Sequence, residues 1–147
     1  MFRVLIAEPH RSRLAATRRA LRAIASTQGC STFELAERRL RSAAPELLVT
    51  NLRLDPHRGI ELVRLAEAPT RSVVYMVPAD PFALREAQDL GAFVEFWPRM
   101  PSALPSYVGA NLPPRDRRDV TVVDRRTLPR GGRRAADAGA LGSATLS

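Results

Sequence analysis

Few side chains have the chemistry for a site, and two of them, Glu8 and Asn51, directly follow or end short apolar runs. The only histidines, His10 and His57, follow on the same two loops, with Glu8 and Asp55 nearby. Imidazole and carboxylate groups at one rim are ligands of transition metals. The alternative is two histidines exposed to solvent, and we expect this second arrangement, with no bound metal. A melting temperature unchanged by Zn²⁺ or Ni²⁺ would support it.

The basic residues are all of one type. The 147 residues include 23 arginines and no lysine, and the formal net charge is +8. Without lysine, Schiff-base and P-loop chemistry are excluded. The single cysteine, Cys30, excludes an internal disulfide and a zinc module built on several cysteines. The longest apolar run, residues 73–77, is too short to cross a bilayer and no signal peptide is recognisable, so we expect a cytoplasmic protein.

Charge density divides the chain near residue 112. Residues 1–112 contain 15 arginines and 11 acids, a net charge of +4, and the much shorter remainder contains 8 arginines and 4 acids, again +4. The remainder has no aromatic residue and no sustained hydrophobic period, apart from a β-prone patch at residues 120–123. We therefore predict one folded domain over residues 1–112 and a basic, disordered, Gly/Pro/Ala-rich tail over residues 113–147.

Five arginines of the tail are candidates for phosphate binding, because a guanidinium group pairs with two phosphate oxygens at once. Their ligand would be a nucleic acid, an acidic membrane surface or a cyclic dinucleotide. The alternative is a solvated tail, since no aromatic side chain is present on which bases could stack. The five residues are Arg125, Arg126, Arg130, Arg133 and Arg134.

Short apolar runs predict the strands. An unbroken apolar run implies a strand that is buried on both faces, which is typical of a parallel sheet. Residues 25–30 are a weaker candidate, and we expect a short edge strand there. The four clear runs are residues 4–7, 47–50, 73–77 and 93–97.

Capping residues mark where the intervening helices begin. Ser12 is expected to cap the first helix, and Ser31 with Glu34 to form a capping box at the second.

Asp80 followed by Pro81 predicts the start of a later helix, which Gly91 closes. A last, weaker helix is expected over residues 102–112. Strands and helices that alternate in this way predict a doubly wound α/β sandwich with a five-stranded parallel sheet.

Four segments in this order resemble the receiver domain of bacterial response regulators over residues 2–112: RVLIAEPH, PELLVTNLRLDPHRG, SVVYMVPAD and DLGAFVEFWP. Gly59, eight residues after Asn51, and the Gly91-Ala92 pair fit the same frame. The resemblance implies a flavodoxin-like sheet with strand order 2-1-3-4-5. It also implies a place in two-component signal transduction or a phosphorelay.

The resemblance further implies a phosphorylation pocket, and this chain departs from it. A receiver accepts phosphate on an aspartate with Mg²⁺ held by that group and an acidic pair, and a hydroxyl and a lysine bind the phosphoryl oxygens. An amide cannot form the acyl phosphate, and we expect the single remaining acid to accept a hydrogen bond from a loop amide or a helix N-terminus. We therefore expect a degenerate pseudo-receiver with no cofactor and no enzymatic activity. The corresponding residues here are Glu8, Pro9, Asn51, Val77 and Pro98, or Trp97 in place of Pro98 after a shift of one residue.

The resemblance and the lost pocket together suggest a signalling or scaffolding module that binds another signalling protein or a second copy of itself. By analogy, its contact surface would include Trp97, Arg99, Leu104 and Tyr107. Glu95 stands where receivers carry a switch aromatic residue. The alternative function is binding of a polyanion, either nucleic acid or cyclic dinucleotide, through the arginine-rich tail.

Overall fold

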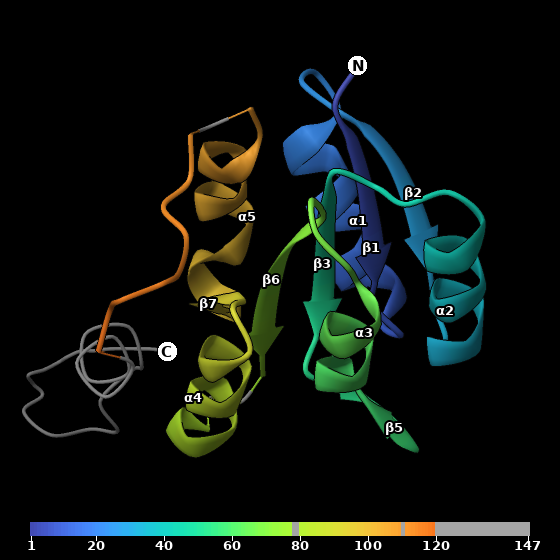
Figure 1. Ribbon diagram of the computed structural model, residues 1–147. Helices are drawn as coiled ribbons and strands as arrows, with labels where there is room; N and C mark the ends of the chain where they lie inside the picture. The colour runs from blue at the N-terminus through green and yellow to red at the C-terminus, as the bar shows by residue number, and fades with distance from the viewer. Residues whose placement is uncertain (78–79, 110, 120–147) are drawn as a thin grey trace, which may run out of the picture. The chain divides into compact units, whose positions relative to one another are not determined.

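The computed structural model describes residues 1–77, 80–109 and 111–119 (Figure 1). The candidate phosphate-binding arginines of the tail and the patch at residues 120–123 lie outside the described residues. In the part of the chain that is described, no helix is long and apolar enough to span a membrane.

A five-stranded parallel sheet forms the centre of the fold, with strand order β2-β1-β3-β6-β7 (Figure 1). The predicted parallel sheet and its order 2-1-3-4-5 are confirmed, including the short edge strand. A two-stranded antiparallel hairpin, β4 (Arg53–Leu54) with β5 (His57–Arg58), follows β3 and was not expected. The strands of the main sheet are β1 (Arg3–Ala7), β2 (Ser26–Cys30), β3 (Leu47–Asn51), β6 (Arg71–Met76) and β7 (Phe93–Phe96).

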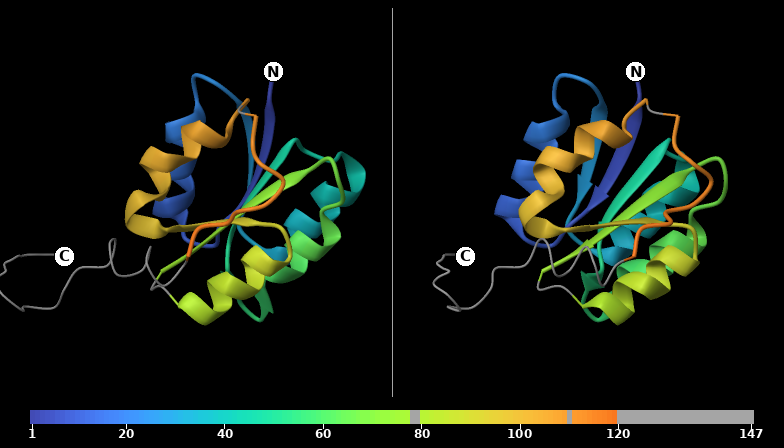
Figure 2. Two further views of the ribbon diagram at one scale, coloured as in Figure 1. Left: turned by 60° about the vertical axis from the view of Figure 1, so that its left-hand side comes forward. Right: turned by 90° about the vertical axis from the view of Figure 1, so that its left-hand side faces the viewer.

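Helices cover both faces of this sheet, as Figure 2 shows: α1 and α5 lie on one face, and α2, α3 and α4 on the other. The α-helices are α1 (Arg11–Leu21), α2 (Phe33–Ser42), α3 (Gly59–Leu65), α4 (Pro81–Asp89) and α5 (Met100–Ala103). Two short 3₁₀ segments flank α5, η1 (Trp97–Arg99) and η2 (Leu104–Tyr107).

Strand alternation divides the core into two layers. Successive side chains of a strand point to opposite faces of the sheet. On β1, Val4 and Ile6 therefore pack in the cluster that includes α1 and α5, and Leu5 and Ala7 pack in the cluster that includes α2 and α3. This explains why the runs read as continuously apolar.

Two of the predicted helix caps are wrong by one or two residues. His10 precedes α1, and Ser12 lies inside its first turn, where its hydroxyl oxygen is 2.9 Å from His10 Nδ1. At α2 the cap is Thr32, whose hydroxyl accepts a hydrogen bond from the Leu35 amide at 3.2 Å. Ser31 and Thr32 both have a capping side chain, and only the path of the loop after β2 selects between them.

The start of α4 is as predicted. The Asp80 carboxylate accepts hydrogen bonds from the Phe82 and Ala83 amides, and Pro81 occupies the first turn, where no amide donor is needed. Gly91, with φ of +98°, follows the end of the helix.

The last helical segment differs in extent from the prediction of residues 102–112. Helical backbone begins directly after β7, at Trp97, and ends at Tyr107. A proline in the first turn of each of its three short segments removes an amide donor, which interrupts the regular α-helical pattern. Gly109, with φ of +70°, then turns the chain away.

Residues 113–117 belong to the same compact unit as the sheet, which runs from Met1 to Arg117. The Arg71 guanidinium donates to the Pro113 carbonyl at 2.6 Å, and the buried Asp116 carboxylate accepts from the Val94 amide at 3.0 Å. Val94 lies on the edge strand β7. This segment therefore covers part of an edge that would otherwise expose backbone donors.

Gly59 lies where two backbone segments meet. Its amide donates to the Leu52 carbonyl at 2.7 Å, and a Cβ atom placed on it would lie 2.3 Å from the Asn51 carbonyl oxygen. Because the obstacle is backbone, relief requires that β3 and α3 move apart.

We predict that Gly59→Ala lowers the free energy of unfolding by about 1–3 kcal/mol or more, the usual cost of overpacking. Urea unfolding followed by circular dichroism measures it. Gly29→Ala is the matched control, because its Cβ would meet only the flexible Leu14 side chain at 3.0 Å. Equal stabilities of the two variants would contradict the prediction.

Candidate functional site

A cleft of about 420 Å³ opens at the carboxyl ends of the strands, where the loops after β1, β2, β3 and β6 meet. Ligand sites of open α/β sheets form at this edge, where the strand order reverses. Three of the residues predicted for the phosphorylation pocket, Pro9, Asn51 and Val77, line it, and Pro98 does not. The lining residues are Pro9, His10, Arg13, Ser31, Thr32, Phe33, Glu34, Asn51, Arg53, Leu54, Asp55 and Val77.

Glu8 is fully buried beside this cleft and accepts four hydrogen bonds. Its Oε1 accepts from Asn51 Nδ2 at 3.0 Å, from the Tyr75 hydroxyl at 2.6 Å and from Arg13 Nε at 3.3 Å. Its Oε2 accepts from the His10 amide at 2.7 Å. Three of these donors contact Oε1 and one contacts Oε2, so both oxygens of the buried carboxylate are hydrogen-bonded. We refer to Glu8, Arg13, Asn51 and Tyr75 as the Glu8 cluster.

The sheet register brings the members of the Glu8 cluster together. Glu8 directly follows β1, and its amide donates to the Cys30 carbonyl at 2.9 Å. Asn51 and Tyr75 are register partners on the adjacent strands β3 and β6. Arg13 lies in the first turn of α1, whose start lies close to the end of β1.

Sequence reasoning named Glu8 and Asn51 and missed Tyr75 and Arg13. A signal for Tyr75 was present: it carries the one hydroxyl inside an otherwise apolar run, and a buried tyrosine hydroxyl usually finds a partner. The predicted hydrogen bond from a loop amide to Glu8 is confirmed, with the His10 amide as donor.

Asn51 is held at both ends of its side-chain amide. Its Nδ2 donates to Glu8, and its Oδ1 accepts from the Arg53 amide at 3.0 Å. An aspartate at this position would lose the donor and place a second carboxylate against Glu8, a contact that disfavours both charged forms.

Tyr75 is a neutral donor in this cluster. Burial, together with the neighbouring Glu8 carboxylate, raises the pKa of Tyr75 well above its ordinary value. The tyrosine therefore keeps its proton throughout the physiological range and is the donor of its hydrogen bond to Glu8.

Trp97 covers the cluster from the side of η1. Its ring centroid lies 5.6 Å from that of Tyr75, and the Arg13 guanidinium lies 6.0 Å from its centroid. Arg13, and not the exposed Arg99, is the cation that contacts the pocket acid.

The predicted contact surface is wrong for two of its four residues. Leu104 is 0% and Tyr107 7% exposed, and both pack in the core with α1 and the sheet. Tyr107 donates to the buried Glu95 carboxylate at 2.5 Å and packs against the Phe93 ring. Trp97 is half-buried, and only Arg99 is fully at the surface.

The residues present do not fit the Mg²⁺ that the resemblance implies. Mg²⁺ in proteins is bound through carboxylates and water. Of the positions that carry acids in a receiver, only Glu8 is an acid here, its oxygens already accept four hydrogen bonds, and Pro9 has no ligand atom. Over the described ranges, no three His, Cys, Asp or Glu side chains form a group that could hold a metal ion.

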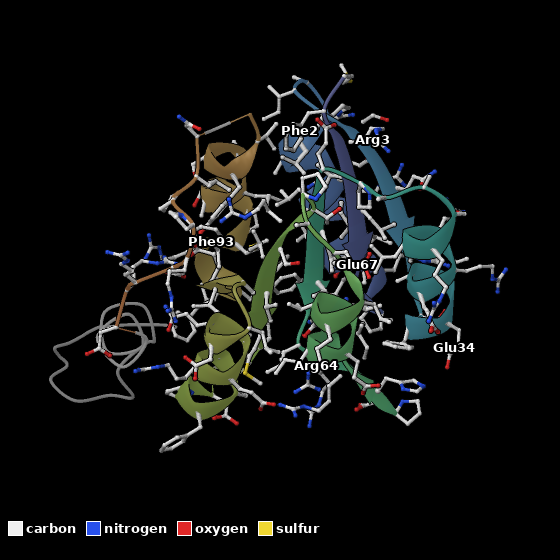
Figure 3. All side chains as sticks on the ribbon, viewed as in Figure 1. Phe2, Arg3, Glu34, Arg64, Glu67 and Phe93 are labelled. Carbon is white, nitrogen blue, oxygen red and sulfur yellow. The ribbon has the colours of Figure 1, made fainter. Side chains whose placement is uncertain are left out.

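The two histidines have separate protein partners. His10 contacts Ser12, and His57 contacts Glu34 at 3.2 Å and Glu61 at 3.4 Å while it stacks on the Phe33 ring. Glu34, labelled in Figure 3, lies in the first turn of α2 at this edge of the sheet. His10 is exposed and His57 is half-buried, so the expectation of two exposed histidines holds for His10 alone.

We predict that Tyr75→Phe lowers the free energy of unfolding by about 1–3 kcal/mol, because it removes a donor from a buried carboxylate. The control is the same change in a Glu8→Gln background, where no charge depends on the hydroxyl. We expect a coupling free energy of about 1 kcal/mol or more from this double-mutant cycle. Additive effects of the two substitutions would contradict the hydrogen bond as the source of stability.

The raised pKa of Tyr75 also predicts a pH dependence. The unfolded tyrosine ionises near pH 10, and the folded one at higher pH, so its stabilising contribution is complete below about pH 10 and declines above it. We therefore expect the stability difference between wild type and Tyr75→Phe to shrink as the pH rises beyond about 10. Urea unfolding at a series of pH values measures it, and a difference that widens at alkaline pH would refute the assignment.

Comparisons with known proteins identify solved structures that have a similar fold. No family model matches the sequence, and the comparison with curated proteins gives no match. Solved structures do match. The chain is similar to the RcsB response regulator of Salmonella typhimurium, with 23% identity and a TM-score of 0.62 over 71% of this chain and 56% of that chain. It thus spans little more than half the length of that protein.

Two isolated receiver domains give matches that cover most of their own length. A CheY-like receiver domain protein from Methanospirillum hungatei has 17% identity and a TM-score of 0.67 over 72% of this chain and 89% of that chain. The receiver domain of a putative Luxo repressor protein from Vibrio parahaemolyticus has 16% identity and a TM-score of 0.64 over 71% and 84%. The fold of this chain is therefore that of the receiver domains of response regulators.

Proposed function

We propose that this protein is a pseudo-receiver, a signalling module of a two-component-type pathway that binds another signalling protein or a second copy of itself without accepting phosphate. One observation carries the proposal: the Glu8 carboxylate is fully buried and accepts four hydrogen bonds from its own chain. The side chains of the pocket thus serve the stability of the fold.

This site lacks the functional groups that phosphoryl transfer requires. Asn51 has no nucleophilic oxygen for an acyl phosphate, and its amide is engaged at both ends. Val77 supplies no hydroxyl to the cleft, and Pro98 supplies no ammonium group. Arg13, the cation that contacts the pocket acid, is paired with Glu8 at 3.3 Å.

The same contacts support a fixed conformation. Tyr75 is held between Glu8 and Trp97, and Glu95 is bonded to Tyr107 inside the core. No aromatic side chain at position 95 is present to rotate between an inward and an outward position. A module with one fixed conformation acts through a binding surface that does not depend on a switch.

Phe82 is the strongest anchor for such a surface. It lies in the first turn of α4 and is 87% exposed, with Val77 at 38% in the loop before it. Large aromatic side chains that become desolvated on binding dominate the energetics of protein interfaces. We propose that a protein partner contacts α4 around Phe82.

We predict that incubation with acetyl phosphate and Mg²⁺ leaves the wild type and Asn51→Asp without a phosphoryl group in intact-mass spectra. The variant restores the nucleophile, but Glu8 still accepts hydrogen bonds from Tyr75, Arg13 and the His10 amide, and Pro9 still offers no ligand. A phosphorylation-competent receiver serves as the positive control. A phosphorylated Asn51→Asp would show that the pocket lacked only its aspartate, and a phosphorylated wild type would refute the proposal.

The binding surface is tested separately, by affinity capture from the native host with full-length protein. We expect Phe82→Ala to lose a specific signalling protein that the wild type retains, or to lose self-association in sedimentation. Ile24→Ala is the matched control, since Ile24 is also an exposed apolar residue, at 42%, but follows α1. Equal capture and equal self-association by wild type and Phe82→Ala would contradict this surface.

A further inference from the structure

The exposed arginines of this protein differ in whether an acid neutralises them. On the face of α2, α3 and α4, three arginines form ion pairs, Arg41 with Glu37 at 2.9 Å, Arg64 with Glu86 at 3.6 Å and Arg85 with Asp89 at 3.8 Å, and Arg38 and Arg39 of α2 form none with the described residues. Arg64 is labelled in Figure 3. The opposite face, covered by α1 and α5 (Figure 2), carries several exposed arginines on and directly after α1.

Two arginines of α1 and the arginine that follows this helix form a single stripe. Arg11, Arg18 and Arg22 are spaced by seven and four residues, which places them on the same side of a helix. All three are exposed, whereas Thr17 and Leu21 of the same helix are buried against the sheet. We call Arg11, Arg18 and Arg22 the arginine stripe.

Within the part of the chain that the structure describes, no acid of a neighbouring element neutralises this stripe. The helix α1 contains no Asp or Glu, and neither do β1, β2, α5 and η2, the elements that pack against it. Across the described parts of the chain, Arg11, Arg18, Arg19 and Arg22 form no ion pair. The positive potential of the stripe therefore reaches the solvent.

A hollow of about 380 Å³ lies along the stripe, lined by Arg18, Arg19 and Arg22 and by small side chains, Ala15, Ala25 and Thr27. Arg18 Nε donates to Thr27 Oγ1 at 3.2 Å, which holds this guanidinium beside the edge strand β2. Small side chains beneath long cations leave space for a phosphate group between them.

We propose that the arginine stripe binds the phosphate backbone of a double-stranded nucleic acid without reading its sequence. From Arg11 to Arg22 the helix rises about 16 Å, and duplex DNA carries one charge per about 1.7 Å of axis, so several phosphates lie within reach.

The composition of the surface favours this ligand over two others. Protein interfaces have a desolvated apolar or aromatic centre, and the stripe offers only alanine and threonine between its arginines. Single-stranded nucleic acids are bound by stacking on aromatic rings, and α1 contains none. A charged, polar surface without either feature matches a duplex backbone.

The test is fluorescence anisotropy with a labelled duplex of about 20 base pairs at several salt concentrations, using the full-length chain. The variant is Arg11→Gln, Arg18→Gln and Arg22→Gln combined, since glutamine preserves helix propensity. The matched control is Arg41→Gln, Arg64→Gln and Arg85→Gln combined, which removes the same number of arginines from ion pairs. Circular dichroism verifies that both variants are folded.

We expect the stripe variant to bind the duplex at least about tenfold more weakly. We also expect its plot of log K against log salt to be less steep by about 2–3, because each phosphate contact contributes about 0.9 to that slope. We expect the control to keep the slope of the wild type. A third variant, with the five predicted tail arginines replaced by serine, is expected to retain stripe-dependent binding.

Four results would overturn the proposal: no binding of duplex by the wild type, equal weakening by stripe and control variants, loss of binding only in the tail variant, or tighter binding of poly-glutamate or single-stranded DNA than of duplex. The proposal goes beyond the pseudo-receiver function and does not depend on it, because none of these measurements involves the Glu8 cluster.

Discussion

The burial of one carboxylate organises the candidate site. A charged group removed from water is costly unless hydrogen bonds and an opposite charge replace its hydration. In place of water, Glu8 is contacted by Tyr75, Asn51, the His10 amide and Arg13. Trp97 then covers Tyr75 and Arg13. These contacts join β1, β3, β6, α1 and η1 at a single point. The edge of the sheet that commonly holds a ligand is here held together by its own side chains.

The presence of internal hydrogen bonds where a receiver binds its ligand has a simple structural basis. Parallel strands carry the side chains that follow them to one edge, so a receiver fold concentrates polar groups there. Where those groups are several acids, they repel one another and a divalent cation relieves the repulsion. With one acid, an amide and a tyrosine, the same geometry yields a set of donors around a single acceptor. The scaffold is retained, and the repulsion between neighbouring acids at the receiver positions is absent, because Asn51 and Pro9 carry no charge.

Charge on the surface follows a second pattern. Arg41, Arg64 and Arg85 on α2, α3 and α4 pair with carboxylates one turn away or on the neighbouring helix, whereas the arginine stripe pairs with no acid of the described residues. Since all basic residues are arginine, the stripe consists of planar groups suited to phosphate. Glu8 adds no compensation there, because it is buried and satisfied by Arg13.

Local pattern in the sequence was sufficient for the strands, their parallel arrangement and the start of α4, because apolar runs and an Asp-Pro cap act within a few residues. It was also sufficient to identify Asn51 and Pro9 as residues without phosphorylation chemistry. The hydrogen bond from Tyr75 to Glu8 joins residues 67 positions apart, and the burial of Leu104 and Tyr107 depends on how a proline-interrupted helix lies on the sheet. Those features, like the absence of acids from the described elements that pack against α1, depend on which elements become neighbours, and only the packing of the chain decides that.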